Sequence, residues 1–353
     1  GTYTNAYVQG YFQYDSKKSG GVTISHLRFA KKPVKSTYYV EKASLVVCTK
    51  ESYLKKIRML DKIQEKGIFV VNSSKKPDDI LMMMSIHDKK IIQSRNVKMY
   101  VIDANKIAKE NGLSGKISAI METIIFKLGK IIDLNFAIDK IKEGLAVKFS
   151  NKSGNLVEKN VNAMEECLDA LVPVKLPYVD FALDLGTKKN MFELIDSGEG
   201  DSLPVSSFLG MVDGRTDAGT SRFDKRDIAD MAPCFISENC ISCNLCSLVC
   251  PHAVVRPFLL NEKEEIDAPE SVARNLINPN IKDQNYKYTI GVSLPDCTGC
   301  GLCSDVCPGK KGAKALVMKA KDALEKDKKV EEYKYLFNEV SEKKNVMNTG
   351  TVK

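Results

Sequence analysis

The sequence predicts a mixed α/β protein: a partial parallel-sheet domain, then an irregular linker, then a smaller cysteine-rich α+β domain. Three observations predict this fold class. Between residues 43 and 128, short apolar runs alternate with helix-like runs, which is typical of parallel strands joined by crossover helices. Residues 186–232 are rich in Gly, Asp and Ser, a composition that favours an irregular connection. Nine of the 11 cysteines fall between residues 234 and 307.

Apolar periodicity places the elements of the first half of the chain. Strands are expected at 44–48, 68–72 and 98–103. An amphipathic helix through 54, 57 and 60 follows the first strand, and a helix through 107 and 108 that stops at 111–112 follows the third. Residues 115–145 are also expected to be helical. Gly67 ends the first of these helices. The run Met82-Met83-Met84 is expected to fill core rather than to bind a ligand.

Length and composition exclude several classes of protein. A chain of 353 residues is long enough for two or three domains. No apolar run approaches the ~20 residues that span a bilayer, and the N-terminus lacks the basic and apolar regions of a signal peptide. The net charge of +8 suits an acidic partner but is also ordinary for a solvated surface, so we expect no membrane and no nucleic acid as partners.

Eight cysteines form one spacing twice. The first run is Cys240-x2-Cys243-x2-Cys246-x3-Cys250-Pro, and the second has cysteines at 297, 300, 303 and 307, again followed by Pro. This is the bacterial ferredoxin run, in which three thiolates on a tight loop hold three corners of an iron–sulfur cube and the fourth cysteine ligates the other cluster.

The spacing therefore predicts two [4Fe–4S] clusters with exchanged fourth ligands. One cluster takes Cys240, Cys243, Cys246 and Cys307, and the other takes Cys297, Cys300, Cys303 and Cys250. Zinc is the alternative, but zinc sites use separated cysteine pairs rather than a repeated triple run. The apolar neighbours of these ligands are expected to exclude water; they are Ile241, Leu245, Leu248, Val249, Leu302 and Val306.

The remaining candidates are less specific. Cys48, Cys167 and Cys234 fit neither run and are expected to be small buried hydrophobes. None of the three histidines, His26, His87 and His252, has a plausible catalytic partner, so we predict no catalytic residue in this chain. The turn Lys17-Lys18-Ser19-Gly20-Gly21, with Thr23 just beyond it, could face phosphate oxygens with its backbone amides and its lysines, or it could be an ordinary turn.

These features divide the chain into four segments. Residues 1–197 form the α/β domain, 198–232 the connecting segment, 233–320 the two-cluster domain, and 321–353 a charged, solvated helical tail. Cys297 follows Cys250 by 47 positions, a spacing longer than a minimal two-cluster ferredoxin needs, so residues 259–290 are expected to be a polar surface insertion.

Several segments resemble one known family. Residues 10–30 (GYFQYDSKKSGGVTISHLRFA) and 202–209 (SLPVSSFL), together with both cysteine runs, resemble pyruvate:ferredoxin (flavodoxin) oxidoreductase in the order of that family. The resemblance covers nearly the whole chain. It implies that the chain is an internal fragment in which residues 1–197 are a γ-type domain without its first strand.

The resemblance also implies a function. Members of the family oxidatively decarboxylate pyruvate with coenzyme A to acetyl-CoA and CO2, and this segment would relay the electrons to ferredoxin or flavodoxin. Thiamine diphosphate, Mg2+ and a third [4Fe–4S] cluster are expected in the remainder of the same polypeptide, so this fragment should be inactive alone. The full enzyme is expected to be a homodimer. The γ-type domain implies that Lys17, Lys18, Ser19, Gly20, Gly21 and Thr23 contribute to coenzyme A binding.

Other interpretations stay open. The chain could be a stand-alone two-cluster electron carrier, or part of a pyruvate:NADP oxidoreductase fusion. Another 2-oxoacid could replace pyruvate as the substrate. The expected compartment is the cytoplasm, with the hydrogenosome or a related anaerobic organelle as the alternative.

Overall fold

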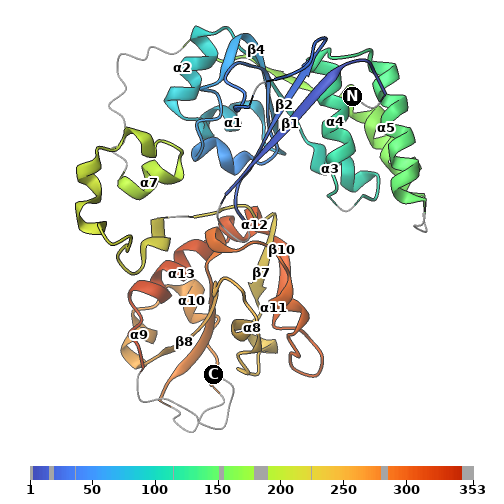
Figure 1. Cartoon of the computed structure of the whole chain (residues 1–353). Coiled ribbons are helices and arrows are strands. Elements are labelled where there is room, and N and C mark those ends of the chain that lie inside the picture. The colour runs from blue at the N-terminus through green and yellow to red at the C-terminus, as the bar shows by residue number, and fades with distance from the viewer. Residues whose placement is uncertain are drawn as a thin grey trace. The chain divides into compact units, whose positions relative to one another are not determined.

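The computed structural model describes residues 3–15, 20–35, 37–113, 115–150, 155–178, 190–223, 225–279 and 285–343. The chain divides into two compact units (Figure 1). The first contains Gly1–Asp15 and Val22–Phe223, and the second contains Ser16–Gly21 and Asp224–Lys353.

In its described residues, the first unit is built on a four-stranded sheet of order β3-β4-β5-β6. The strands are β3 (Ala43–Cys48), β4 (Ile63–Asn72), β5 (Lys98–Ile102) and β6 (Val172–Val174). β3 and β5 both run parallel to β4, whereas β6 is antiparallel to β5. The prediction of a parallel sheet is therefore confirmed, and β4 begins earlier than its apolar run indicated.

Side chains of the central strand alternate between two cores, because successive strand residues point to opposite faces. Phe69 and Val71 pack on one face with α1 and α2, and Val70 packs on the other with α3, α4 and α6. α5 packs on α4 and α6 outside that second layer. The helices are α1 (Pro77–Met83), α2 (Ile86–Ser94), α3 (Ala104–Glu110), α4 (Ser118–Gly129), α5 (Leu134–Phe149) and α6 (Leu156–Cys167).

A separate antiparallel hairpin begins the chain. It consists of β1 (Tyr7–Tyr14) and β2 (Thr23–Ala30), which pair over all eight residues of each strand. Several of its aromatic side chains are exposed, including Tyr7, Phe12 and Tyr14. Residues 10–14 and 23–30 of the segment that carries the family resemblance therefore lie on this hairpin.

Three predictions for this unit were wrong in detail. The helix through residue 57 is only a short 3-10 helix, Glu51–Lys55. Leu54 and Leu60 are both buried, yet on one α-helix they would point about 120° apart. The helical residues 115–145 are two helices, α4 and α5, and Lys130 ends α4 in the left-handed region at φ 48°. Met84 is buried as expected, but Met82 is 74% exposed.

Between residues 190 and 223 the Gly-rich segment holds short helices and no strand, and its last two residues begin β7 (Met231–Phe235). α7 (Met191–Asp196) begins with a capping box between Asn190 and Glu193. Phe192 and Phe223 stack with ring centroids 5.5 Å apart. Glu199, which follows α7, forms an ion pair with Arg58 at 2.6 Å. The domain boundaries at 197/198 and 232/233 stay predictions.

The second unit contains two antiparallel strand pairs in its described residues. One pair is β7 (Met231–Phe235) with β10 (Leu316–Ala320), and the other is β8 (Val255–Leu260) with β9 (Lys287–Val292). One core joins both pairs and contacts five cysteines of the two runs. Cys297 and Cys303 are buried in this core, and Cys240, Cys246 and Cys250 pack against it. The helices are α8 (Leu245–Leu248), α9 (Glu262–Ile266), α10 (Glu270–Ala273), α11 (Leu302–Asp305), α12 (Lys321–Lys326) and α13 (Lys329–Asn338).

The segment predicted as a surface insertion, 259–290, is partly core. Its first and last residues belong to β8 and β9, where Leu260 is fully buried and Tyr288 is 3% exposed. The reason is long-range: β9 pairs with β8, and sequence spacing does not reveal that pairing. Residues between these strands include α9 and α10, with Val272 in a small core.

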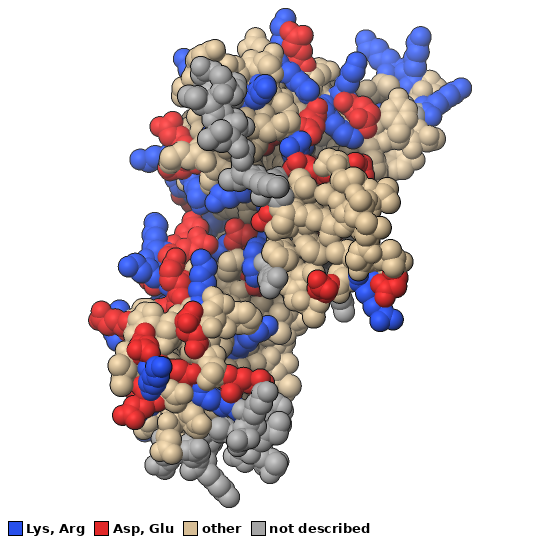
Figure 2. Space-filling view, turned by 90° about the vertical axis from the view of Figure 1, so that its left-hand side faces the viewer, with Lys and Arg blue, Asp and Glu red and all other residues tan. Residues whose placement is uncertain are grey.

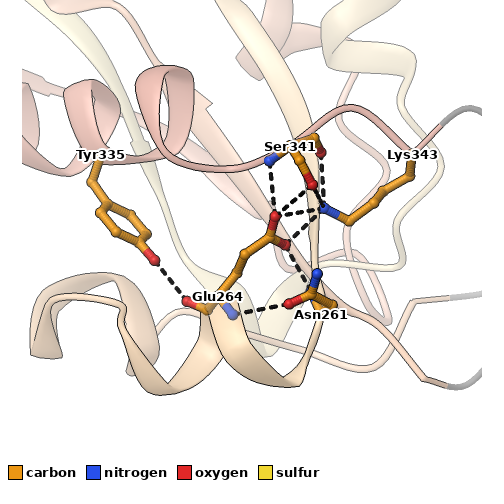
Figure 3. A network of polar contacts seen from close by, with 5 residues as sticks. All are labelled: Asn261, Glu264, Tyr335, Ser341 and Lys343. Carbon is orange, nitrogen blue, oxygen red and sulfur yellow. Dashed lines mark hydrogen bonds and ion pairs between the residues drawn. The ribbon is translucent and has the colours of Figure 1, made fainter.

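The segment predicted as a solvated tail, 321–353, also packs into the fold in its described part. Leu324 of α12 and Leu336 of α13 are buried. Lys343 forms an ion pair with Glu264 of α9, and the Tyr335 hydroxyl donates to the carbonyl oxygen of Glu264 (Figure 3). A few apolar residues at helical spacing are therefore enough to bury one side of these charged helices.

Positive and negative side chains are interspersed on the face drawn in Figure 2, as a modest net charge implies. Among the helices that the structure describes, none has the length and apolar character needed to cross a bilayer.

Candidate iron–sulfur sites

The structure brings the cysteines of the two runs together as two sets in the second unit. Site one is the set Cys240, Cys243, Cys246 and Cys307, which line a single hollow. Three of these come from the first run, and Cys307 comes from the second. The fourth cysteine of the second run therefore lies with the first three of the other run.

Site two is the set Cys250, Cys297, Cys300 and Cys303. The pKa of Cys297 is raised first by burial and then by the nearby thiols of Cys250 and Cys300. Cys303 has the same two thiol neighbours and Cys297 as well. The structure thus places the eight cysteines in the two sets that the spacing predicts; their roles as ligands stay a prediction.

The two loops repeat the same local geometry. In site one, the backbone N–H of Ser242 donates to Cys240 Sγ at 3.3 Å, and in site two the N–H of Gly299 donates to Cys297 Sγ at 3.4 Å. Ser242 and Gly299 both adopt positive φ, at 50° and 72°. This conformation lets the loop turn back around its first cysteine and aim an amide at the sulfur.

The fourth cysteines also receive amide hydrogen bonds. Val254 N–H donates to Cys250 Sγ at 3.4 Å, and Ala315 N–H donates to Cys307 Sγ at 3.2 Å. Hydrogen bonds to the sulfurs are one of the means by which a protein tunes the reduction potential of a cluster.

Burial makes the free thiols hard to ionise. Desolvation raises the pKa of Cys246 to about 12 and that of Cys303 to about 11. Metal ligation requires the thiolate, so metal loading must displace these protons. Binding of a cluster is therefore expected to be coupled to proton release and to folding of this unit.

The donor set fits iron–sulfur clusters. Each site offers four thiols, which is the usual ligand set of a [4Fe–4S] cluster. In the residues described, no group of three or more His, Cys, Asp or Glu side chains, these thiols included, converges on a single metal ion. A [4Fe–4S] cube is larger than one ion and is held by thiols at its four corners, which lie farther apart. Cys246 and Cys303 lie close enough to interact electrostatically, so the two sites are neighbours.

A tyrosine that sequence analysis missed lies against site one. Tyr288 of β9 lines the same hollow as the four cysteines, and its hydroxyl donates to Asn244 Oδ1 at 2.7 Å. Burial first, and then the thiols of Cys240, Cys246 and Cys243, raise the pKa of this phenol. The alternation of Tyr288, Ile290 and Val292 with smaller or polar residues was the available signal for a strand. The structure buries both faces of that strand.

The predicted apolar shell does not seal the sites. Five of its six members are at least 36% exposed: Ile241, Leu245, Leu248, Leu302 and Val306. Four of these belong to or directly follow the one-turn helices α8 and α11, which are too short to bury more than one side. Water is instead excluded from behind the cysteines by buried strand residues, such as Ile290 and Leu316.

The three cysteines outside the runs are buried, as predicted. Burial raises the pKa of Cys48 and of Cys167 to about 12. Cys48 Sγ donates to the carbonyl oxygen of Lys50, and Cys167 Sγ donates to that of Met164. These environments suit inert core thiols rather than metal ligands.

The candidate phosphate-binding turn is only partly described. Lys17, Lys18 and Ser19 lie outside the described residues. Gly20 has φ 73°, and a Cβ there would come within 2.5 Å of Arg226 Cδ. Thr23 is the first residue of β2 and pairs with Tyr14. The turn therefore needs glycine at residue 20 for steric reasons, and it brings a cation, Arg226, close to it.

Three regions of the chain match known families. Residues 2–170 match the family described as pyruvate ferredoxin/flavodoxin oxidoreductase, and residues 236–311 match a 4Fe–4S dicluster domain. Residues 189–229, between them, match a domain of unknown function.

Similar proteins carry related names. The chain is 41% identical to pyruvate:ferredoxin oxidoreductase of Moorella thermoacetica, over 100% of this chain and 30% of that protein. It is 35% identical to pyruvate-flavodoxin oxidoreductase of Klebsiella pneumoniae, over 92% and 28%. It is 34% identical to pyruvate dehydrogenase [NADP(+)] of Cryptosporidium parvum, over 87% and 18%. The chain thus spans less than a third of the length of these relatives.

A solved structure shows a weaker likeness. Pyruvate oxidoreductase subunit PORC of Thermotoga maritima aligns with a TM-score of 0.36 and 18% identity, over 48% of this chain and 83% of that one.

Proposed function

Because the chain belongs to the pyruvate ferredoxin/flavodoxin oxidoreductase family, we propose that it is the electron-transfer part of an enzyme that oxidises pyruvate. The reaction would use coenzyme A and yield acetyl-CoA, CO2 and two electrons. The observation that carries the proposal is the position of Cys307 beside Cys240, Cys243 and Cys246. That exchange between distant runs builds two neighbouring four-thiol sites of the kind that hold [4Fe–4S] clusters.

The residues of this chain hold the clusters and set their surroundings. When bound, a [4Fe–4S] cluster accepts and releases single electrons. Cys240, Cys243, Cys246 and Cys307 would hold one cluster, and Cys250, Cys297, Cys300 and Cys303 the other. The amides of residues 242, 254, 299 and 315 donate to the sulfurs and so stabilise the negative charge that accompanies reduction. The closeness of Cys246 to Cys303 supports transfer between the sites.

The carbon chemistry is proposed to lie elsewhere in a longer polypeptide. The relatives are about three times as long as this chain. Thiamine diphosphate, Mg2+ and a third cluster would belong to that remainder, and the complete enzyme would be a homodimer. The isolated chain is then expected to form no acetyl-CoA from pyruvate, and detection of that product would contradict this part of the proposal.

The electron acceptor is proposed to be ferredoxin or flavodoxin, the partners in the names of the bacterial relatives. The relative from Cryptosporidium parvum, named for NADP(+), supports a second candidate, a fusion that passes electrons on to NADP. The sequence that adjoins this chain in its gene would separate the two, because the second requires a nucleotide-binding reductase region.

The turn at residues 17–23 is proposed to contribute to coenzyme A binding. Lys17 and Lys18 supply two positive charges, and Arg226 lies against Gly20. The Arg226 Nε is buried without a hydrogen-bond partner in the described structure. Equilibrium binding of coenzyme A by the parent chain and by a Lys17→Gln/Lys18→Gln variant tests this role, and equal affinity would exclude it.

The proposal as a whole is tested by metal analysis of the anaerobically purified chain. We expect about eight irons and eight acid-labile sulfides per chain, with two interacting electron paramagnetic resonance (EPR) signals after dithionite reduction. Two zinc ions without labile sulfide would overturn the electron-transfer function.

A further inference from the structure

A basic hairpin adjoins site one. Residues 308–315 connect α11 to β10 and form a loop at the edge of the second unit (Figure 1). Lys310 and Ala313 pair as an antiparallel bridge, while Lys311 and Gly312 between them have φ of 53° and 84°. Two successive residues of positive φ are typical of the tight type I′ turn. The connection is therefore a defined hairpin rather than an irregular loop.

The hairpin is attached directly to the cysteine site. Cys307 immediately precedes it, and Ala315 at its other end donates its N–H to Cys307 Sγ at 3.2 Å. Asn239 Nδ2, one residue before Cys240, donates to the carbonyl oxygen of Lys314 at 3.2 Å. Both ends of the hairpin are thus held by residues that belong to or adjoin site one.

Three positive charges lie on this hairpin. Lys310, Lys311 and Lys314 are all exposed. No acidic group pairs with their ammonium groups within the described part of the chain. Like charges on a short loop repel one another, so their clustering does not stabilise the hairpin. An external acidic surface would neutralise them.

Site one is also the more accessible of the two sites. Each site has one exposed cysteine, Cys243 and Cys300. Cys297 and Cys303 of site two are only 6% and 7% exposed, whereas no cysteine of site one falls in the buried class. Ile241, which lines the hollow of site one, is 42% exposed. An apolar rim beside unpaired charges suits a small, transient interface.

The flank of site two has a different electrostatic character. Asp296, next to Cys297, forms an ion pair with Lys225 at 2.8 Å. Lys321, whose charge acts on Cys297, is buried and pairs with Asp227 and Glu325. The lysines near site two, Lys225 and Lys321, are therefore paired within the protein. No acidic partner is found among the described residues for the three lysines near site one.

We propose that the basic hairpin, residues 308–315, is the docking surface for an acidic one-electron carrier protein, and that site one is the electron exit. This inference rests on the proposed electron-transfer function and adds to it the exit site and the residues that bind the partner. With a cluster held at site one, one electron would pass from it to the oxidised iron–sulfur or flavin centre of the carrier. No bond forms or breaks, and the carrier is the oxidant.

The experiment compares charge variants of the hairpin. The test variant is Lys310→Gln/Lys311→Gln/Lys314→Gln. The matched control, Lys98→Gln/Lys109→Gln/Lys116→Gln, removes three exposed lysines from the first unit and changes the net charge equally. The probes are a purified acidic bacterial ferredoxin and an acidic flavodoxin, both oxidised. Calorimetry gives Kd, and stopped-flow mixing with the dithionite-reduced chain gives the transfer rate.

At low ionic strength we expect the Kd of the test variant for the carriers to be about ten-fold higher than that of the parent chain. Its electron-transfer rate should be about ten-fold lower. The deficit should vanish near 1 M salt, where the Debye length is about 3 Å. The control should stay within about two-fold of the parent chain. A charge-preserving Lys310→Arg/Lys311→Arg/Lys314→Arg variant should retain parental rates, which excludes a folding defect as the cause.

The two proposals fail in different ways. With both clusters present and reducible, two results would overturn the proposed docking surface. One is a Kd and a transfer rate in the test variant equal to those of the parent chain, and the other is an equal loss of affinity and rate in the control variant. Absence of iron and labile sulfide from the parent chain would overturn the electron-transfer function. Because site one is the proposed exit, that absence would overturn the docking surface as well, whereas a failure of the charge variants with both clusters present overturns the docking surface alone.

Discussion

The Tyr288 hydroxyl donates a hydrogen bond to Asn244 Oδ1 across 2.7 Å and so joins β9 to the cysteine loop of site one. Asn244 lies between Cys243 and Cys246 and has φ 59°. Its counterpart in site two is Gly301, at φ 81°, which has no side chain to be held. The two loops therefore share a backbone shape, but the loop of site one has an additional support from a distant strand.

Removal of this support is expected to weaken site one selectively. Tyr288→Phe should cost about 1 kcal/mol of unfolding free energy, the net value of one hydrogen bond, and should speed iron loss from site one to a chelator. Asn244→Gly loses the same bond but keeps the backbone conformation available, so it should behave similarly. EPR monitors the loss of each cluster during chelation. If both variants lose the clusters of the two sites at equal rates, the bond does not support the loop.

Replacement of Cys307 tests the exchange of fourth ligands. Cys307→Ser should abolish or alter the cluster at site one, although this cysteine belongs by sequence to the second run. We expect about half of the iron to be lost and the EPR signal of site two to remain. Cys234→Ala, which removes a thiol outside both sets, should retain about eight irons. Loss of the site-two signal in Cys307→Ser would contradict the arrangement.

Two glycines of the basic hairpin should differ sharply in their tolerance of substitution. At Gly309 a Cβ would lie 1.8 Å from the Ala313 carbonyl oxygen, and φ is 60°. Gly309→Ala should therefore open the hairpin and reduce the iron content of site one. At Gly312 the same atom meets open space, with φ 84°, and Asn tolerates positive φ. Gly312→Asn should keep full iron content, and similar iron in both variants would argue against the hairpin geometry.

The ion pair of Glu264 and Lys343 predicts a pH dependence (Figure 3). Burial alone would raise the pKa of Glu264, but hydrogen bonds from Lys343, Asn261 and Ser341 outweigh it and lower the pKa to about 2. Because the folded-state pKa lies below the unfolded one, the carboxylate stabilises the fold above about pH 4.5 and loses this effect as the pH falls toward 2.

Lys343→Met should thus reduce the unfolding free energy at pH 7 by about 1–2 kcal/mol. The difference from the parent chain should shrink below about pH 4.5. Urea unfolding followed by circular dichroism at pH 7, 5 and 4 measures both effects. Lys326→Met, at an exposed position of α12, serves as the control and should change stability little. A difference between the Lys343 variant and the parent chain that does not depend on pH would contradict the role of Glu264.

Local patterns predicted β3, β4 and β5 because these strands are short apolar runs that pack into cores on both faces of the sheet. The hairpin strands β1 and β2 and the short strand β6 were not predicted. Prediction failed where burial depends on distant partners. Leu54 and Leu60 enter one core from an irregular segment, and no helical period relates them. The helices at 321–338 look solvated in the sequence, yet Leu324 and Leu336 pack into cores formed by strands of the same unit.

By itself the sequence determined the chemistry of this protein: eight thiols in two repeated runs, at spacings that only a loop around a cluster requires, within a chain of one recognisable family. The tertiary structure decided what surrounds those thiols. It brought Tyr288 from a segment expected at the surface to the loop of site one, left Leu248 of α8 and Leu302 of α11 exposed, and placed three exposed lysines on the hairpin that follows Cys307. The reason is physical: ligand spacing is a local property of the chain, whereas solvent exclusion and charge compensation depend on residues that pack together only after folding.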